Sequence, residues 1–320
     1  MQTTLTNSAE KAAAILNSGG VVAFPTETVY GLGAGICHPQ AIKQIFQAKG
    51  RPGDNPLIVH IYSVEQLADV ADEINSDAQK LIELFFPGPL TLVLKKNRCV
   101  PDTVTAGLQT VGIRCPVNPI AREFLRLSHC PVAAPSANLS GLPSATSWEA
   151  VYEDLDGKID CVLCGTPSAI GLESTIVDCF GPNPLLLRAG AITLEQLQAI
   201  VPAITTPAAT DKGAPPKSPG LKYPHYAPKA AIILCHAHEK MIIGEAPSAY
   251  IGLSAPPQGI ALIKICESLE EYGRELFSFF RRCDTEGIHV IYCELPSYQG
   301  LGRAIRDRLT RAANKENNAL

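Results

Sequence analysis

The stretch VVAFPTETVYGLG (residues 21–33) runs from a short apolar segment, residues 21–24, into a turn crowded with hydroxyls and glycines. A short apolar run that ends at a proline is typical of a buried strand. Open α/β sheets bind their ligands just beyond the ends of such strands. The stretch therefore indicates an α/β fold with a site for a small polar ligand. An ordinary loop is the competing interpretation of this stretch alone.

Segments of helical and of strand character alternate around this stretch. We expect helices at residues 8–18, with Ser8 as N-cap, and at 39–48, 76–86, 118–127 and 193–201. We expect strands at residues 57–61, 90–94, 110–114, 162–164, 175–179 and 185–188. A second series has strands at 231–235, 249–253, 260–265 and 290–294 and helices at 269–282 and 302–313. It predicts a small three-layer α/β unit.

A proline-rich segment, residues 206–228, separates the two series. Prolines recur at positions 207, 215, 216, 219, 224 and 228, which removes ladder donors and favours extended conformations. The segment ends in SPGLKYPHYAP (residues 218–228), where Lys222, Tyr223, His225 and Tyr226 can bind ligands. We therefore divide the chain into a first domain at 1–205, a linker at 206–228 and a second domain at 229–320.

Composition narrows the class of protein. Hydrophobic residues make up 46% and charged residues 18% of the chain, which suits packed domains and not a disordered chain. The net charge of −4 and the lack of a Lys/Arg-rich run argue against tight docking on bare nucleic acid. We find no signal peptide and no apolar stretch of the ~18 residues that a membrane span needs, so we expect no membrane contact.

The 11 cysteines lie mostly within apolar segments, as Cys179, Cys235 and Cys293 do. Free cysteine in such surroundings behaves as a small core hydrophobe, so we expect no disulfide framework and a cytoplasmic location. Cys161 and Cys164 form a CxxC pair without a second pair at zinc spacing. A buried strand is a better interpretation of this pair than a metal or redox site.

Two further loops carry groups suited to a phosphate-bearing ligand. AKGRPGDNP (residues 48–56) places Lys49 and Arg51 around a glycine, where two cations can neutralise phosphate oxygens. The spacing of a P-loop is absent. VAAPSANLSG (residues 132–141) ends an apolar strand with Ser136 and Asn138. A solvated basic turn and a plain Asn/Ser turn are the competing interpretations.

Several single residues extend this set. Arg114 ends the segment VGIR, Arg188 ends LLLR, and Ser174 lies in GLESTIVD (residues 171–178). An arginine at the end of an apolar run is usually a surface residue. His60, within an apolar segment, is by itself more typical of a core histidine than of a ligand.

Taken together, PTETVYGLGA, KGRPGDNPLIVH, SAN, GLESTIVD, LLRAGAIT and SPGLKYPHYAP resemble the Sua5/YrdC/YwlC family. Residues 8–200 resemble its YrdC-like domain. The whole chain, including GLGRAIRDRLTRAA (residues 300–313), resembles its two-domain Sua5 form. The resemblance implies an α/β fold with an N-terminal twisted mixed sheet and flanking helices, and a smaller C-terminal Rossmann-like α/β domain.

The resemblance implies a nucleotidyltransferase. The family joins L-threonine, bicarbonate and ATP into threonylcarbamoyl-adenylate, with Mg²⁺ held mainly by the ATP phosphates, for t6A formation at position 37 of tRNAs that read ANN codons. The product would pass to the tRNA threonylcarbamoyl transferase, with weak or absent direct binding of tRNA by this chain. Residues 206–228 would act as a lid that excludes water from the labile intermediate.

The family pattern also implies roles for individual residues. Lys49 and Arg51 would be catalytic. The residues expected to contact ATP are Arg51, Asn55, Thr110, Ser136, Asn138, Ser144, Arg188 and Tyr223. The residues expected to contact threonine are Thr28, His60, Arg114, Ala134 and Ser174, with Arg114 facing the carboxylate. No residue is expected to bind the metal directly.

Three positions depart from the family pattern. Pro224 replaces an arginine and is expected to loosen contact with the phosphates, while Ala189 replaces a proline and Leu221 a methionine. A double-stranded-RNA-binding or ribosome-maturation protein is the alternative function, because a basic cleft could hold a phosphate backbone. A carbamoyl-transfer enzyme of hydrogenase maturation would add paired CxxC zinc motifs, which this sequence lacks.

Overall fold

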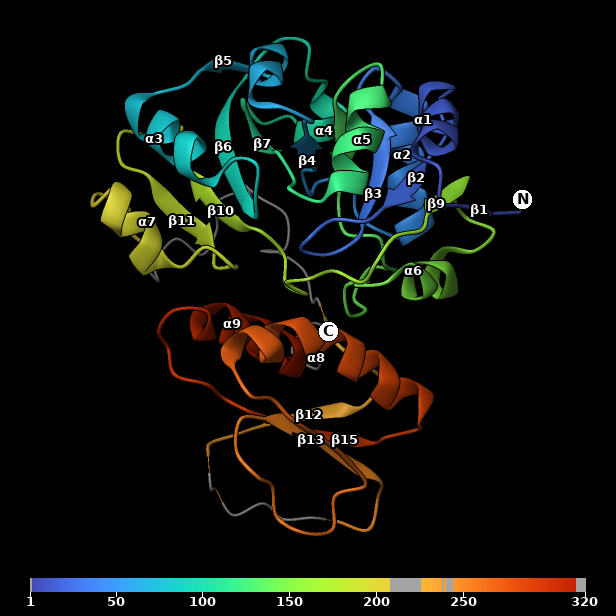
Figure 1. The fold of residues 1–320 in the computed structure, drawn as a ribbon, viewed down its shortest axis with the longest axis vertical. Coiled ribbons are helices and arrows are strands. Elements are labelled where there is room, and N and C mark those ends of the chain that lie inside the picture. The colour runs from blue at the N-terminus through green and yellow to red at the C-terminus, as the bar shows by residue number, and fades with distance from the viewer. Residues whose placement is uncertain (1, 208–225, 238, 240–243, 315–320) are drawn as a thin grey trace.

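The computed structural model describes residues 2–207, 226–237, 239 and 244–314. Two α/β units lie one above the other along the long axis (Figure 1). Helices α8 (Leu269–Thr285) and α9 (Gly302–Ala313) lie between the larger N-terminal unit and the sheet of the smaller C-terminal unit. The division into a larger and a smaller α/β domain is therefore the one that the sequence predicts, while the boundaries at 205 and 228 stay a prediction.

The larger unit is built on one mixed sheet. Its strands are β1 (Thr4–Thr6), β2 (Val22–Phe24), β3 (Gly31–Gly35), β4 (Ile58–His60), β5 (Ala71–Glu73), β6 (Leu90–Lys96), β7 (Thr110–Arg114), β8 (Val132–Ala134), β9 (Cys161–Leu163), β10 (Thr175–Asp178) and β11 (Leu185–Arg188). They lie in the order β1-β9-β2-β3-β8-β4-β7-β6-β10-β11, and β5 pairs with β6. β4 runs parallel to β7, with His60 opposite Arg114, and antiparallel to β8. This pairing brings two predicted site residues side by side.

Helices flank this sheet: α1 (Ala9–Asn17), α2 (Pro39–Lys49), α3 (Ser76–Phe85), α4 (Asp102–Thr105), α5 (Pro119–Leu127), α6 (Trp148–Leu155) and α7 (Leu194–Ile200), with a 3₁₀ turn at Val64–Asp69. Their starts follow from local sequence. Ser8 accepts a hydrogen bond from the Lys11 backbone as the expected N-cap, and Asn118 caps α5 ahead of a first-turn proline. The expected helices are confirmed, and α4 and α6 were missed. In the described part of the chain, no helix is both long and apolar enough to cross a membrane.

Residues 31–33, expected to be part of a turn, instead begin the strand β3. Its glycines serve packing. A Cβ on Gly33 would lie 2.7 Å from the Val132 side chain and 3.0 Å from the ring of Phe24. Glycine is therefore required, because β2, β3 and β8 pack closely at this point. Propensity rules count glycine as unfavourable in a strand, so they do not predict β3.

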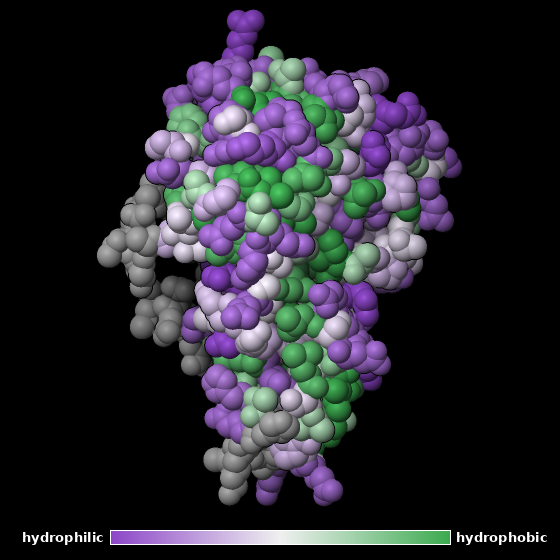
Figure 2. Space-filling model, turned by 60° about the vertical axis from the view of Figure 1, so that its left-hand side comes forward, coloured by the Kyte–Doolittle hydropathy of each residue, from purple (hydrophilic) through white to green (hydrophobic). Residues whose placement is uncertain are grey.

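The smaller unit has a fully parallel sheet in the order β12-β15-β13-β14. Its strands are β12 (Ala231–Cys235), β13 (Ser248–Gly252), β14 (Leu262–Ile265) and β15 (Val290–Glu294). The prediction of three layers was wrong, because α8 and α9 lie on the same face of this sheet, toward the larger unit (Figure 1). On the sheet, Ile233, Ile263 and Ile265 are 43%, 47% and 46% exposed. Figure 2 shows hydrophobic residues gathered along one side of the lower half of the molecule.

The two units share apolar contacts. The core of the smaller unit includes Leu276, Phe277 and Phe280 of α8, which are 0% exposed. Val29 and Leu172 belong to the larger unit by sequence, yet they lie in this same cluster. Two loops of the larger unit are therefore held by the core of the smaller one.

The cysteines follow the expectation with one exception. A disulfide joins Cys37 to Cys130, where only free thiols were expected, because the start of α2 and the loop before β8 meet although they are far apart in sequence. The other cysteines are free. Cys161 lies in the buried strand β9, as predicted for the CxxC pair, and burial raises the pKa of its thiol to about 12. A buried thiol of raised pKa is typical of a structural, unreactive cysteine.

Candidate active site

Most of the predicted site residues line one pocket. The pocket residues that the sequence predicted are Thr28, Arg51, His60, Arg114, Ala134, Ser136, Asn138, Ser144, Ser174 and Arg188. They come from the loops after β2, α2 and β8, from the ends of β4, β7, β8 and β11, and from the loop before β10. Polar groups at strand ends are thus brought together as the α/β interpretation predicts.

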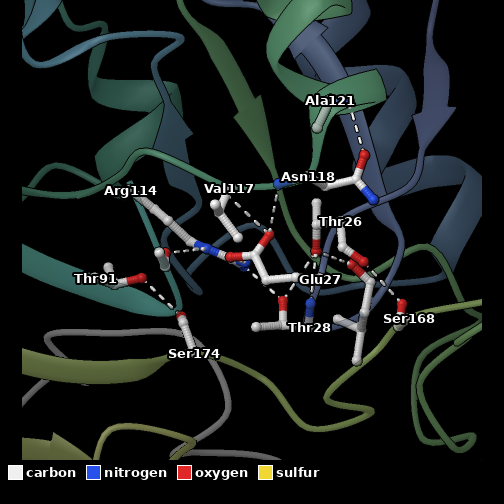
Figure 3. Close-up of polar contacts among 12 residues, drawn as sticks. Thr26, Glu27, Thr28, Thr91, Arg114, Val117, Asn118, Ala121, Ser168 and Ser174 are labelled. Carbon is white, nitrogen blue, oxygen red and sulfur yellow. Dashed lines mark hydrogen bonds and ion pairs between the residues drawn. The ribbon is translucent and has the colours of Figure 1, made fainter. Parts of the chain in front are cut away.

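Arg114 is held in place from several sides, as Figure 3 shows. Its Nη2 donates to Glu27 Oε1 and its Nη1 to Thr28 Oγ1, both at 2.6 Å. Nε lies 3.4 Å from the Gly88 carbonyl oxygen, and the other oxygen of Glu27 accepts from the Val117 backbone at 3.2 Å. Because a guanidinium has five N–H donors, the remaining ones can bind a carboxylate in the pocket.

His60 is a neutral group in the pocket. Its ring is edge-on to Phe24, and its Nδ1 lies 3.2 Å from the Ile58 carbonyl oxygen. Burial lowers the pKa of His60 to about 3, and the nearby charge of Arg114 adds to the effect. At neutral pH the imidazole is therefore uncharged, so it does not repel a cationic amine.

Lys49 connects the two phosphate-type loops. Its Nζ donates to the Ser136 carbonyl oxygen at 2.7 Å and also to the Asn138 carbonyl oxygen. Burial, and then the charge of Arg51, lower the pKa of Lys49 well below its usual value. Lys49 does not line the pocket itself. Its hydrogen bonds hold the backbone of the loop that carries Ser136 and Asn138.

Arg51 lines the pocket, whereas Asn55 and Thr110 do not. Arg51 Nη2 donates to the Pro56 carbonyl oxygen at 3.1 Å. In the described part of the chain, both amide atoms of Asn55 and the Oδ1 of Asn138 are buried without a hydrogen-bond partner. Such a buried polar atom costs roughly 1–3 kcal/mol. Asn138 lines the pocket, so its Oδ1 can accept a hydrogen bond from a ligand there, whereas the amide of Asn55 is buried away from the pocket lining.

Ser174, which lines the pocket, contacts side chains of the two strands β6 and β11. Its hydroxyl lies 2.7 Å from Thr91 Oγ1 and 3.1 Å from Arg188 Nη2. Burial lowers the pKa of Arg188 to about 10, so this arginine stays charged at neutral pH. A close backbone approach makes the contact possible, because a Cβ on Gly190 would lie 2.6 Å from the Glu173 carbonyl oxygen.

Among the residues that were not assigned from the sequence, Glu173 and Tyr226 line the pocket, and Glu27 does not line it but forms an ion pair with Arg114. Glu27 lies in PTETVYGLGA and Glu173 in GLESTIVD, two of the segments that resemble the family. Their partners, Arg114 and Arg308, are far away in sequence. No spacing rule identifies such pairs. Tyr226 carried a usable signal, since it stands among the ligand-competent side chains at the end of the linker.

Some predictions concern residues outside the described part of the chain. They are the nucleotide contact Tyr223, the side chains Lys222 and His225, and the departures Leu221 and Pro224. Among the described residues, no group of three or more His, Cys, Asp or Glu side chains could hold a metal ion.

Comparisons with known proteins cover nearly the whole chain. A Sua5–YciO–YrdC family model described as telomere recombination matches residues 14–190, and one described as the C-terminal domain of threonylcarbamoyl-AMP synthase matches residues 192–314. Threonylcarbamoyl-AMP synthases of Pyrococcus abyssi and Bacillus subtilis are each 42% identical, over 94% and 95% of this chain and 93% and 92% of theirs. The crystal structure of Pyrococcus abyssi Sua5 complexed with L-threonine superposes with a TM-score of 0.88 at 40% identity, covering 98% of this chain and 97% of that one.

Proposed function

The chain belongs to the two-domain threonylcarbamoyl-AMP synthase family, and on this premise we propose how its pocket carries out the reaction. The activity is that of a nucleotidyltransferase that makes threonylcarbamoyl-AMP for t6A modification of tRNA. ATP and L-threonine are its substrates. The match over both domains decides against the RNA-binding and hydrogenase-maturation alternatives.

Threonine binds at the Arg114 end of the pocket. Arg114 takes the carboxylate with the donors that Glu27 and Thr28 leave over. The hydroxyls of Thr28 and Ser174 and the backbone at Ala134 surround the rest of the amino acid. His60 faces the amine as a neutral group that does not repel it, and the ammonium loses its proton to water before the free amine captures carbon dioxide from bicarbonate.

ATP binds along the loops that Lys49 joins. Arg51 and Arg188 carry charge that can neutralise the triphosphate, and Ser136, Asn138 and Ser144 offer hydrogen bonds to the nucleotide. The Asn55 carbonyl oxygen lies 3.3 Å from Nη2 of Arg51, which lines the pocket, and this supports its predicted place near the nucleotide. Thr110 and Tyr223 keep their predicted nucleotide contacts as part of this proposal.

The chemistry needs positioning more than covalent help. The neutral threonine amine and bicarbonate give a carbamate and water, and the carbamate oxygen then attacks the α-phosphorus of ATP while pyrophosphate leaves. Arg51 faces the developing charge. Lys49 acts in part by fixing the Ser136–Asn138 loop, because two of its donors already serve that backbone.

The remaining partners follow from the same reaction. Mg²⁺ enters as part of the MgATP substrate, since the described residues offer no carboxylate cage for it. The labile product passes to the tRNA threonylcarbamoyl transferase, and direct tRNA binding by this chain is weak or absent. The free cysteines support a cytoplasmic location, while the Cys37–Cys130 disulfide counts against it.

We propose that residues 206–228 act as a lid, although residues 208–225 of this segment lie outside the part of the chain that the structure describes. The support is Tyr226, which is 5% exposed and lines the pocket, and Ala227, whose backbone donates to the Gly141 carbonyl oxygen at 2.9 Å. The end of the segment is therefore anchored beside the Ser136–Asn138 loop.

The observation that carries the proposal is the buried Arg114–Glu27–Thr28 arrangement beside a neutral histidine, because it suits an amino acid with a free carboxylate. The test is a turnover assay with labelled bicarbonate, L-threonine and MgATP. We expect label in threonylcarbamoyl-AMP and one pyrophosphate for each product molecule. Pyrophosphate release that does not require threonine would contradict the proposal.

A further inference from the structure

An arginine of the smaller unit contacts a residue that lines the pocket. Arg308 lies on α9, and its side chain is 0% exposed. Its Nε donates to Glu173 Oε2 at 2.8 Å, and its Nη2 donates to the Ala189 carbonyl oxygen at 3.0 Å. Since Glu173 lines the pocket and Ala189 follows Arg188, Arg308 ties α9 to two segments of the site.

The contact continues from Glu173 into the pocket. The other oxygen of Glu173 lies 2.5 Å from Ser144 Oγ. A carboxylate can only accept hydrogen bonds, so the Ser144 hydroxyl donates its hydrogen to Glu173. The lone pairs of Ser144 are then left to accept an N–H or O–H group of a bound ligand.

The charge of Glu173 depends on Arg308. Burial by itself would raise the pKa of Glu173, but Arg308, Arg188 and the hydrogen bond from Ser144 together lower it below its usual value. Without Arg308, burial would dominate, and Glu173 would take up a proton at a higher pH. A protonated Glu173 could donate to Ser144 and turn the hydroxyl hydrogen toward the ligand.

Two neighbouring contacts place Arg308 where the smaller unit meets the pocket wall. Its guanidinium carbon lies 5.5 Å from the ring centroid of Tyr226, which lines the pocket and stacks on Phe277 of α8 at 5.2 Å. Leu172, directly before Glu173, is 0% exposed in the core of the smaller unit. The loop that carries Glu173 is therefore held both by the ion pair with Arg308 and by the packing of Leu172.

We propose that Arg308 is a positioning residue for threonylcarbamoyl-AMP synthesis, which keeps Glu173 ionised so that Ser144 is presented to the nucleotide as a hydrogen-bond acceptor. The inference rests on the proposed placement of ATP in this pocket. It gives the smaller unit a part in the reaction beyond holding the chain together.

The test measures kcat and the KM for ATP across pH in the full chain. Arg308→Gln should lower kcat/KM for ATP by on the order of 10- to 100-fold, as misplacement of a ligand-contacting group does. It should also create a loss of activity at acid pH that the parent chain lacks, because Glu173 is then protonated. Arg308→Lys, which keeps the charge, should restore most of the parent pH profile.

A double-mutant cycle tests the route through Ser144. Because Arg308 acts through this hydroxyl, Arg308→Gln added to Ser144→Ala should cost much less than Arg308→Gln alone. The loss of activity at acid pH, the acid limb of the pH profile, should disappear when Glu173→Gln is combined with Arg308→Gln. If Arg308→Gln fails to fold, Arg308→Lys and Glu173→Gln are compared with the parent chain instead. Glu173→Gln should then show the loss of kcat/KM for ATP that is expected of Arg308→Gln, and Arg308→Lys should not.

Two matched variants separate positioning from docking. Arg281→Gln breaks a partly buried ion pair between the units, with Asp154 at 2.8 Å, and a hydrogen bond to the Pro143 carbonyl oxygen at 2.6 Å, neither of which involves Glu173. Arg282→Gln removes an exposed pair on the same helix. We expect no new acid limb from either. Additive losses with Ser144→Ala, or the same acid limb from Arg281→Gln, would overturn the proposal. Parent turnover in the same assay tests the function itself.

Discussion

We expect His60 to make the stability of the protein depend on pH. A histidine has a pKa of 6.5 when unperturbed, and burial lowers that of His60 to about 3 in the folded chain. Below pH 6.5 the unfolded chain therefore binds a proton that the folded chain does not. The stabilising contribution is fully present above the unfolded pKa and is lost as the pH falls. At about pH 5 the loss is about 2 kcal/mol, since the gap to the unfolded pKa is roughly 1.5 pH steps at ~1.4 kcal/mol each.

Urea unfolding of the parent chain and of His60→Gln measures this contribution. Between about pH 7.5 and pH 5 the free energy of unfolding should fall by roughly 2 kcal/mol less in the variant than in the parent chain. His289→Gln, at an exposed position, is the matched control and should keep the parent's pH dependence. Equal slopes for the parent and His60→Gln would refute the reasoning, because His60 would then titrate alike in both states.

Other expected outcomes concern catalysis. Arg51→Ala should leave the fold intact, as followed by circular dichroism, and should lower kcat by on the order of a hundredfold if Arg51 stabilises developing charge; near-normal turnover would exclude that role. Glu27→Gln should raise the KM for threonine about tenfold with a smaller change in kcat, because a charged hydrogen bond that orients Arg114 is lost; an unchanged KM would mean that Arg114 is held without it. Steady-state kinetics should show threonine favoured over serine by tens-fold, since one methyl is worth roughly 1–3 kcal/mol, and little use of 2-aminobutyrate. Equal rates with 2-aminobutyrate would show that the hydroxyl is not recognised. ATP with threonine should slow protease cleavage within residues 206–228, and cleavage at the same rate would count against a lid.

Local patterns predicted most of the fold. The apolar segments that became β4, β7, β10 and β15 have the length and composition of buried strands, and Ser8 marked the start of α1 as its side-chain hydrogen bond confirms. β3 was missed because its glycines are there for close packing against Phe24 and Val132, which only the neighbouring strands reveal. The number of layers in the smaller unit depends on which face its helices cover, and no local pattern encodes that choice.

The site divides in the same way. Arg51, Ser136 and Asn138 were found because they follow predicted strands and helices in short quoted segments. Glu27 was missed because its importance lies in a 2.6 Å ion pair with an arginine 87 residues away. Lys49 was found, yet its two backbone hydrogen bonds to the Ser136–Asn138 loop depend on folding. The sequence therefore predicted residues that gather in one pocket, while their roles stay predictions, and long-range contacts decide which side chain orients which.

Val29 and Leu172 lie in the apolar cluster of the smaller unit although the rest of their neighbours in sequence belong to the larger one. Pulling the units apart would expose both side chains, at about 1.5–3 kcal/mol for each, and would also break the Arg308–Glu173 pair. Even a total of about 4 kcal/mol confines a separated state to roughly one molecule in a thousand. ATP, threonine and product therefore meet the two units docked in nearly every molecule, and a separated state contributes only through that small population.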